Sequence, residues 1–446
     1  TMTAFDKIIG YDSIKNKLIK ICDMLKNKEC YIALGAKPIS GVLLYGEPGL
    51  GKTLVAKCFI EESNLPSFTI RHDKNDSEFI PEISNTFEKA KKQAPCIVFL
   101  DDLDKFSDVN DDDHNRSTPE YSAVQSAFDN IKGTDIFVIA TANNIDPLPE
   151  SLLRAGRFDC KITFNVPNTK DSAEIVKHYL AGKKLASDVN LDDVSKMIAY
   201  DSCAELESVI NSAAANAAFA RRDCIAMSDI VSAVIQSSYN FCGNIESFSE
   251  ENMRRISVHE AGHIVASEVL VPESVGFASI QCHEYDDDGS GFTHYCKNQR
   301  NNKDRIIISL AGKAATDILL PKDCFEGCSS DFRKAYGNIR DMIENGSYGI
   351  GFLEIYGYKF LSNPTAQRSA DYVVRAELER YMRIARELLI KNREFLEKAA
   401  SALSKKGYLL HSDIQKIRKS ITVINANFVS PLLNTYSGEN IEVCNL

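Results

Sequence analysis

The 446-residue sequence predicts an α/β domain with a helical lid, followed by a second, mainly α-helical domain. Three observations predict this order. A short apolar strand leads through a glycine-rich loop into a helix, and two further apolar strands end in acidic or amide residues. The second half carries a His-Glu-x-x-His run within a helical apolar pattern. A chain of this length is expected to form two or three domains, each with its own core.

The composition is that of a globular protein and argues against two kinds of partner. Hydrophobic residues make up 44% of the chain and charged residues 26%. The formal net charge of −10 argues against a general surface for nucleic acids or anionic membranes. No segment approaches the ~18 consecutive apolar residues that span a bilayer. We therefore expect a soluble protein with no nucleic-acid and no membrane partner.

The 13 cysteines are scattered without a paired framework, which predicts reduced thiols and a cytoplasmic location. Cys324 and Cys328 form one close pair, but a structural zinc site needs a second pair, so we favour no metal there. The chain opens with Thr1-Met2 and no signal peptide. A lone Thr before Met resembles the remnant of an expression tag, so we expect a natural start at Met2 and no membrane anchor.

The first element is an apolar strand from Val42 to Tyr45, followed by a loop and a helix. Glycines let backbone N–H groups turn toward phosphate oxygens, and the helix N-terminus adds the positive end of its dipole. Lys52 would reach the β- and γ-phosphates of ATP, and the Thr53 hydroxyl would bind Mg²⁺. The loop that fits G-x-x-x-x-G-K-[ST] consists of Gly46, Glu47, Pro48, Gly49, Leu50, Gly51, Lys52 and Thr53.

Two later strands place polar side chains near the same loop. The strand of residues 96–100 runs into Asp101 and Asp102, and that of residues 136–140 ends near Asn143. Because α/β sheets bind ligands at the carboxyl ends of their strands, we expect these side chains at the nucleotide. Asp101 would hold Mg²⁺ through water, Asp102 would polarise the attacking water, and Asn143 would contact the γ-phosphate side.

The run His259-Glu260-Ala261-Gly262-His263 predicts a zinc site. Apolar residues around it fit a helix, and residues four apart face one side, so both imidazoles can bind one Zn²⁺. Glu260 can then reach a zinc-activated water as general base. The competing interpretation is a pair of histidines on a solvated face. The third histidine of the metzincin pattern is absent, so a third ligand has to come from elsewhere.

These motifs lie in a chain that resembles the FtsH family, AAA+ ATPases fused to a zinc metallopeptidase, from about Phe5 to about Ile417. "FDKIIGYDSIKNKL" resembles the family's first segment, with Gly10 near the adenine. "IATANNIDPLPESLLRAGRFD" is similar to its sensor-1 segment and second region of homology. The resemblance implies that Asn143 is sensor 1. It also implies that Arg154 and Arg157 are arginine fingers reaching a neighbouring subunit, and hence a ring, usually a homo-hexamer.

The resemblance also implies a domain order. We expect an AAA+ α/β domain at residues 1–166, a helical lid at 167–240 and a zincin-type metallopeptidase domain at 250–417. A tail at 418–446 carries no motif. In the lid, "SCAELESVINSAAANAAFARR" resembles the family's Ser-Gly-Ala-Asp-Leu helix, with Cys203 where glycine is usual and Ala204 matching.

The same resemblance supplies further candidates in the peptidase domain. "FEGCSSDFRKAYGNIRDMI" resembles the family's Gly-Ala-Ser-Asn-Asp helix start and implies that Asp331 is the third zinc ligand, although a helix N-cap is the competing role. Asp317 is a candidate for orienting a ligand imidazole. An edge strand around residues 278–281 would pair with substrate. His283 and His294 are interpreted as surface or packing histidines.

Three segments depart from the family pattern. Asp102 stands where glutamate is usual and is one methylene shorter. The substrate-gripping Phe-Val-Gly loop is missing, and Phe79-Ile80 is the one pair expected to serve in its place. Residues 129–131, Asp-Asn-Ile, replace an intersubunit Asp-Gly-Phe signal.

We therefore expect a ring-forming, ATP-dependent zinc endopeptidase that degrades cytosolic proteins and uses Zn²⁺, ATP and Mg²⁺. The alternative is an AAA+ remodelling or assembly ATPase with slow hydrolysis and weakly coupled or vestigial proteolysis.

Overall fold

The computed structural model divides into two compact units, Thr1–Gly182 with Tyr200–Ser208, and Lys183–Ala199 with Val209–Leu446. In the part of the chain that is described, no helix is both long enough and apolar enough to cross a bilayer. The structure describes residues 3–72, 76–107, 118–239, 249–280, 291–297, 301–321, 328–344 and 364–425.

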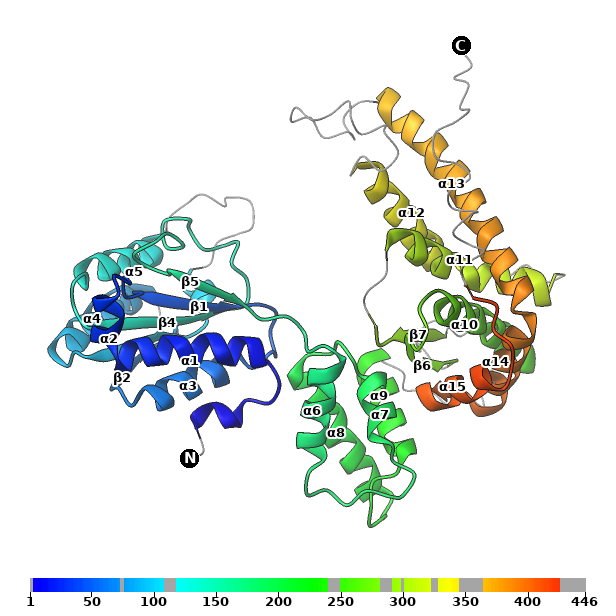
Figure 1. Cartoon of the computed structure of the whole chain (residues 1–446), viewed down its shortest axis with the longest axis horizontal. Helices are drawn as coiled ribbons and strands as arrows, with labels where there is room; N and C mark the ends of the chain where they lie inside the picture. The colour runs from blue at the N-terminus through cyan, green and yellow to red at the C-terminus, as the bar shows by residue number, and fades with distance from the viewer. Residues whose placement is uncertain are drawn as a thin grey trace. The chain divides into compact units, whose positions relative to one another are not determined.

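The first unit is built on a five-stranded parallel sheet of order β2-β3-β4-β1-β5 (Figure 1). The three strands expected from apolar runs are all present, at β1, β3 and β4, and the two middle strands β3 and β4 are buried at every position. The α/β fold class predicted from the sequence is confirmed. The strands are β1 Gly41–Tyr45, β2 Ser67–Ile70, β3 Cys96–Leu100, β4 Ile136–Ala142 and β5 Cys160–Thr163.

Successive side chains of each strand point to opposite faces of this sheet, and helices cover both faces, so the unit has two cores. Leu43 of β1 enters the core made with α4 and α5, whereas its neighbours Val42 and Leu44 enter the core made with α1 and α3. The helices of this part are η1 Ala4–Lys7, α1 Asp12–Lys26, α2 Lys28–Ala33, α3 Lys52–Ser63, α4 Asp76–Lys92, η2 Leu103–Lys105 and α5 Pro119–Asn130.

The prediction that Phe79-Ile80 serves in place of the substrate-gripping loop is wrong for Phe79. This side chain is fully buried in α4, where its ring packs edge-on against Phe106, with centroids 4.9 Å apart. Phe79, Ile83 and Phe87 are spaced by four residues and form the buried stripe of an amphipathic helix. The apolar residue therefore serves the core of the sheet and does not face a pore.

Four helices occupy the range predicted for the lid: α6 Thr169–Leu180, α7 Leu191–Met197, α8 Cys203–Phe219 and α9 Met227–Tyr239. Helix α6 falls in the first unit and α7 in the second, and α8 begins in one and ends in the other. The predicted domain boundaries therefore stay predictions.

The second unit is mainly helical, as predicted, and α11, α13 and α14 pack against α10 (Figure 1). Helix α10 is buried without interruption from Ile256 to Val269 because α11 and α14 pack along it. Such continuous burial explains why the apolar pattern of this helix is not confined to one side. Besides α7, α9 and the end of α8, the helices of this unit are α10 Glu250–Leu270, α11 Asn302–Leu319, α12 Ser329–Glu344, α13 Pro364–Lys391, α14 Arg393–Lys406 and α15 His411–Lys419.

A small antiparallel sheet of order β7-β6-β8 lies beside α10, formed by β6 Val275–Ser279, β7 Phe292–Tyr295 and β8 Tyr408–Leu410. The expected edge strand around residues 278–281 is wrong, because β6 pairs with β7 on one side and β8 on the other. Within the described residues β7 is an outer strand. The partner β8 comes from far along the sequence, so no local pattern announces it.

One buried carboxylate ties the C-terminal end of α10 to this sheet. Glu268 is fully buried and accepts hydrogen bonds from the backbone N–H of Glu273 and of Val275, each at 2.9 Å. The Gln415 amide of α15 donates a third, at 3.0 Å.

Replacing Glu268 by Ala is expected to lower the free energy of unfolding by about 2–5 kcal/mol, because two buried N–H groups and an amide lose their acceptor. Urea unfolding followed by circular dichroism measures this. The matched control is Glu394→Ala, whose carboxylate is exposed and paired only with Lys398, and it should change stability by about 0.5 kcal/mol or less. Equal effects of the two substitutions would contradict the role assigned to Glu268.

Candidate metal centre and nucleotide site

Two histidines on one side of α10 face each other. His259 and His263 are one helical turn apart, and their side chains are almost completely buried. Their ring planes are nearly perpendicular, at 82°, and the two Nε2 atoms lie 3.1 Å apart. The alternative of two histidines on a solvated face is wrong for this helix.

Asp331 brings a carboxylate to these imidazoles from the first turn of α12. Its Oδ2 atom lies 3.0 Å from Nε2 of His259 and 3.1 Å from Nε2 of His263. Asp331 is the third residue of α12, so its side chain faces the imidazoles and does not cap the helix. Among the described residues, these three form the one group of metal-ligating side chains whose donor atoms all converge within 4.8 Å.

The spacing of the three donor atoms fits a zinc ion. Zinc bonds of ~2.0–2.1 Å in a tetrahedral site place neighbouring ligand atoms ~3.3 Å apart. The observed separations are 3.0, 3.1 and 3.1 Å. Two imidazoles and one carboxylate are also the ligand types of catalytic zinc sites, which keep one position open.

The backbone of α11 fixes which nitrogen of His263 faces the cluster. Nδ1 of His263 donates a hydrogen bond to the carbonyl oxygen of Ile308 at 2.7 Å. A neutral imidazole with its proton on Nδ1 has its lone pair on Nε2, the atom that points at Asp331. The ring is therefore held in the tautomer that can ligate a metal.

The electrostatics of the cluster favour a bound cation. Burial lowers the pKa of His263, but the Asp331 carboxylate outweighs it and raises that pKa to about 9. For Asp331, burial raises the pKa, yet hydrogen bonds with His259 and His263 hold it well below its usual range. A positive charge placed between these groups is stabilised, whether a proton or a metal ion supplies it.

Two glycines allow α10 and α11 to approach closely enough to form the site. A Cβ atom at Gly312 of α11 would lie 2.6 Å from Nε2 of both histidines, inside the space a ligand would use. A Cβ atom at Gly262 would lie 2.7 Å from the Cβ of Ala315 and would also meet the Ala311 carbonyl. Sequence reasoning missed Gly312, although a glycine inside an apolar helical run is a recognisable signal.

Glu260 lies between the two histidines in sequence, and only 3% of its surface is exposed. Its Oε2 atom accepts a hydrogen bond from the Thr293 hydroxyl of β7 at 2.7 Å. No sequence pattern singles out Thr293. His294 of the same strand is half-buried, bonds to the backbone of Ala199, and has a pKa lowered to about 4 by burial. It therefore packs as expected, and His283 lies outside the described residues.

The predicted role of Asp317 in orienting an imidazole is wrong. Its carboxylate pairs with Lys313 on its own helix, at 2.8 Å, and with Arg386 of α13. The partner of His263 is instead a backbone carbonyl, which no sequence pattern identifies. Asp317 fastens α11 to α13 and does not touch the metal-ligating cluster.

At the nucleotide loop, the structure gathers the predicted side chains around Lys52. Its ammonium group donates to the carbonyl oxygens of Gly46 and Glu47, at 2.6 and 2.7 Å, and to Oδ1 of Asn143 at 2.9 Å. Gly46, Gly49 and Gly51 all have positive φ angles, which side chains rarely adopt. The remaining loop residues, Pro48 and Leu50, complete the turn into α3.

The groups predicted to hold Mg²⁺ are already paired. The Thr53 hydroxyl donates to Oδ1 of Asp101 at 3.0 Å, and Thr141 of β4 donates to the same oxygen at 2.7 Å. Asp102 follows in a left-handed conformation with φ of 56°. Its carboxylate pairs with Lys105 at 3.0 Å and lies 3.6 Å from Arg71.

Gly10 and Ala204 lie against other residues of the same unit. The Ala204 backbone N–H donates to the Gly49 carbonyl of the loop at 3.1 Å. Gly10 has φ of 69°, and a Cβ there would lie 3.1 Å from Asp171 of α6. Ala204 thus bonds to the loop directly, whereas Gly10 contacts the start of α6.

The two predicted arginine fingers differ in exposure. Arg154 has a side chain 73% exposed, with a loose 3.7 Å contact to Glu150. Arg157 is held within the chain, since it pairs with Asp129 at 3.0 Å and donates to the Ser151 carbonyl at 2.5 Å. Asp129, which the resemblance places at an intersubunit signal, is thereby engaged with a side chain of the same chain.

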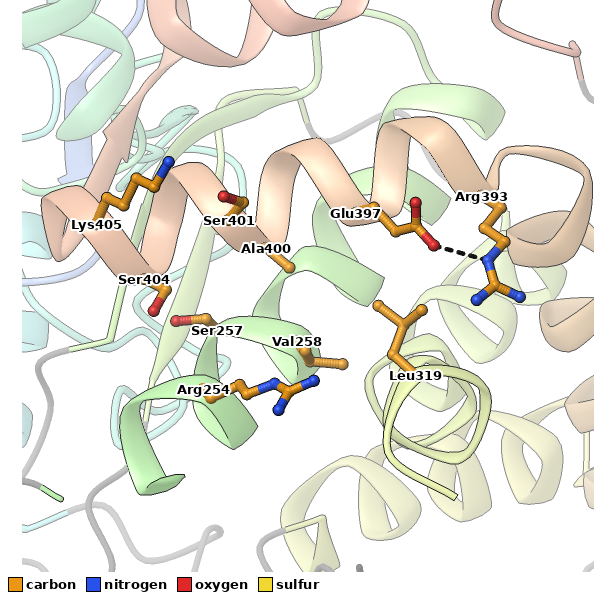
Figure 2. A pocket seen from close by; sticks show the side chains of 10 residues that line it. All are labelled: Arg254, Ser257, Val258, Leu319, Arg393, Glu397, Ala400, Ser401, Ser404 and Lys405. Carbon is orange, nitrogen blue, oxygen red and sulfur yellow. Dashed lines mark hydrogen bonds and ion pairs between the residues drawn. The ribbon is translucent and has the colours of Figure 1, made fainter. Parts of the chain in front are cut away.

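A cavity of about 450 Å³ opens in the second unit between α10 and α14 (Figure 2). Arg393 and Glu397 pair across one helical turn at its rim. None of the three metal-ligating residues lines it, so this hollow is separate from the candidate metal centre. The lining residues are Arg254, Ser257, Val258, Leu319, Arg393, Glu397, Ala400, Ser401, Ser404 and Lys405.

The fold and the two sites define a class of protein, a P-loop ATPase joined in one chain to a zinc-peptidase type of centre. Residues 42–166 match the family described as "ATPase family associated with various cellular activities (AAA)". This match covers the sheet and the nucleotide loop of the first unit.

Proteins named "ATP-dependent zinc metalloprotease FtsH" match nearly the whole chain. The one from Caldicellulosiruptor bescii is 30% identical over 93% of this chain and 71% of its own length. The one from Thermus thermophilus is 30% identical over 93% and 70%, and that from Mycoplasma pneumoniae is 31% identical over 93% and 62%. The chain belongs to the FtsH family. It spans 62 to 71% of the length of these relatives.

Replacing Asp331 by Ala is expected to weaken zinc binding at least ~100-fold, since one of three protein ligands is lost. Zinc content after dialysis, and competition with a chromophoric chelator, measure this. The matched control is Asp317→Ala, which removes a carboxylate paired with Lys313 and Arg386 and should leave zinc content unchanged. Retention of full zinc affinity without Asp331 would refute its role as a ligand.

Proposed function

We propose that this protein is an ATP-dependent zinc endopeptidase acting on protein substrates. The observation that carries the proposal is the convergence of His259, His263 and Asp331 within 3.0–3.1 Å, with a buried Glu260 between the two histidines in sequence. Family membership supports the same function, because relatives that match over 93% of this chain bear that name. The two imidazoles and the carboxylate are the residues that would hold zinc.

The chemistry follows from the positions of these groups. Zinc, when bound, lowers the pKa of a water molecule toward ~7 and polarises the scissile carbonyl. Glu260 takes a proton from the attacking water and delivers it to the leaving amine. Burial of Glu260 keeps bulk water from competing for this proton.

The first unit would bind ATP and Mg²⁺. Lys52 would exchange its bonds to the loop carbonyls for bonds to the phosphates. The Thr53 hydroxyl, which now donates to Asp101, would bind Mg²⁺, and Asp101 would hold the ion through water. Asn143 would sense the γ-phosphate beside Lys52. Gly10 would lie near the adenine, and Ala204 would link the loop to α8.

A homo-hexameric ring is the proposed assembly. The exposed guanidinium of Arg154 is available to a neighbouring subunit, where it would stabilise charge on the transferred phosphoryl group. Arg157 would have to break its ion pair with Asp129 before it could reach a neighbouring subunit. Reduced thiols favour cytosolic proteins as substrates.

A second function is favoured by two observations. The Asp102 carboxylate is short and engaged with Lys105, and the residue nearest to the missing gripping loop, Phe79, is buried. Both would weaken the coupling of ATP hydrolysis to substrate unfolding. They favour an AAA+ remodelling or assembly ATPase with slow hydrolysis and weakly coupled proteolysis.

Degradation of casein separates the two functions. Glu260→Gln removes the general base and leaves the zinc ligands in place, so we expect cleavage to fall by at least ~100-fold while zinc content stays unchanged. The assay compares wild type and variant with and without ATP. Equal cleavage by both proteins would exclude a zinc peptidase, whereas cleavage of casein that ignores ATP would favour the weakly coupled ATPase.

A longer carboxylate side chain at position 102 tests the ATPase activity proposed for the first unit. Asp102→Glu should raise the kcat of ATP hydrolysis by ~10-fold or more, because a one-methylene misplacement of a catalytic group costs up to ~100-fold. A coupled phosphate-release assay measures this. Asp102→Asn keeps the length but lacks the charge and should abolish hydrolysis without loss of ATP affinity. A Glu variant no faster than wild type would show that side-chain length is not limiting.

A further inference from the structure

The carboxylate of Glu260 has a hydrogen-bond partner outside the metal-ligating cluster. The Thr293 hydroxyl, on β7, donates to Oε2 of Glu260 at 2.7 Å. The two residues come from different elements, and the strand supplies the hydroxyl to a helix that it packs against. A buried carboxylate without a donor is unfavourable, so this bond stabilises the Glu260 side chain where it lies.

The residue directly before this strand also lies against the Glu260 side chain. Gly291, directly before β7, comes so close that a Cβ there would lie 2.6 Å from Cγ and 2.9 Å from Oε1 of Glu260. Residues 291 and 293 are two apart, so their side-chain directions point to the same face of an extended strand. The backbone of Gly291 packs against the Glu260 side chain, and the hydroxyl of Thr293 donates a hydrogen bond to its carboxylate.

We propose that Thr293 is a positioning residue for the general base, an inference that rests on the peptidase function proposed above. It holds the Glu260 carboxylate through Oε2, and that carboxylate receives the proton of the attacking water. Thr293 keeps its own proton throughout, so it adds no step to the reaction. Its effect is to restrict a side chain that would otherwise sample several rotamers.

The position of Thr293 explains why a hydroxyl on a β-branched residue suits this site. Its χ1 angle is restricted, so the hydroxyl is aimed with little loss of conformational entropy. Valine has the same shape without the hydroxyl, and serine has the hydroxyl without the methyl group. These two substitutions separate hydrogen bonding from packing at one position.

The experiment uses the full chain with a short, unstructured fluorogenic peptide, so that cleavage does not depend on unfolding. Wild type, Thr293→Val and Thr293→Ser are compared for kcat, KM, zinc content and melting temperature. The matched control is Thr316→Val on α11, which removes a buried hydroxyl that donates to the Lys313 carbonyl at 2.8 Å. Glu260→Gln serves as the reference for loss of the base.

We expect Thr293→Val to lower kcat by ~10- to 100-fold, the range typical for loss of a group that orients a catalytic residue. KM should stay within about twofold and zinc content should not change, because Thr293 touches none of the three ligands. Thr293→Ser should recover most of the activity, and Thr316→Val should retain it. Gly291→Ala provides an independent variant, with the same fall in kcat and full zinc content expected.

Three results would overturn the inference: unchanged kcat in Thr293→Val, equal loss in the Ser and Val variants, or loss of zinc together with activity. The last would assign Thr293 a structural role. If wild type and Glu260→Gln cleave the peptide equally, the peptidase function itself fails. If Glu260→Gln is inactive while Thr293→Val is normal, only the positioning role fails.

Discussion

The candidate metal centre depends on the contact of the Asp331 carboxylate with two imidazoles. This contact joins the first turn of α12 to the middle of α10, two segments separated in the sequence by β6, β7 and α11. Three polar groups buried together without a cation would be costly, so the packing around them is arranged for a positive charge. Continuous burial of α10 and the tautomer set by Ile308 act on this one cluster, and the bond from Thr293 acts on the neighbouring Glu260.

Much of the fold could be predicted because its signals are local. The glycines of the loop from Gly46 to Thr53 and the helix that follows it identify a phosphate-binding loop from the sequence alone. The apolar runs before Asp101 and Asn143 are short and uninterrupted, which predicts strands and not helices. The spacing of His259 and His263 implies one helical face. The assignment of Asp331 needed a resemblance to a family, since no local pattern links it to α10.

The errors came from contacts between distant segments. Whether β6 is an edge strand depends on β8, more than a hundred residues later, and the orientation of Asp317 depends on Arg386 of α13. Phe79 was assigned by its place relative to a missing motif, although its four-residue spacing with Ile83 marks a helix core. Thr293 gave no signal, because a threonine in a strand is ordinary until its neighbour across the fold is known.

Gly312 carries a consequence for recognising inactive relatives of this protein. Its missing side chain is what leaves room between the two imidazoles. A homologous chain that keeps His-Glu-x-x-His and the distant aspartate, but has alanine at the position corresponding to 312, would place a methyl group where the ion belongs. Such a chain would retain every residue by which a peptidase is usually recognised and still be a pseudoenzyme.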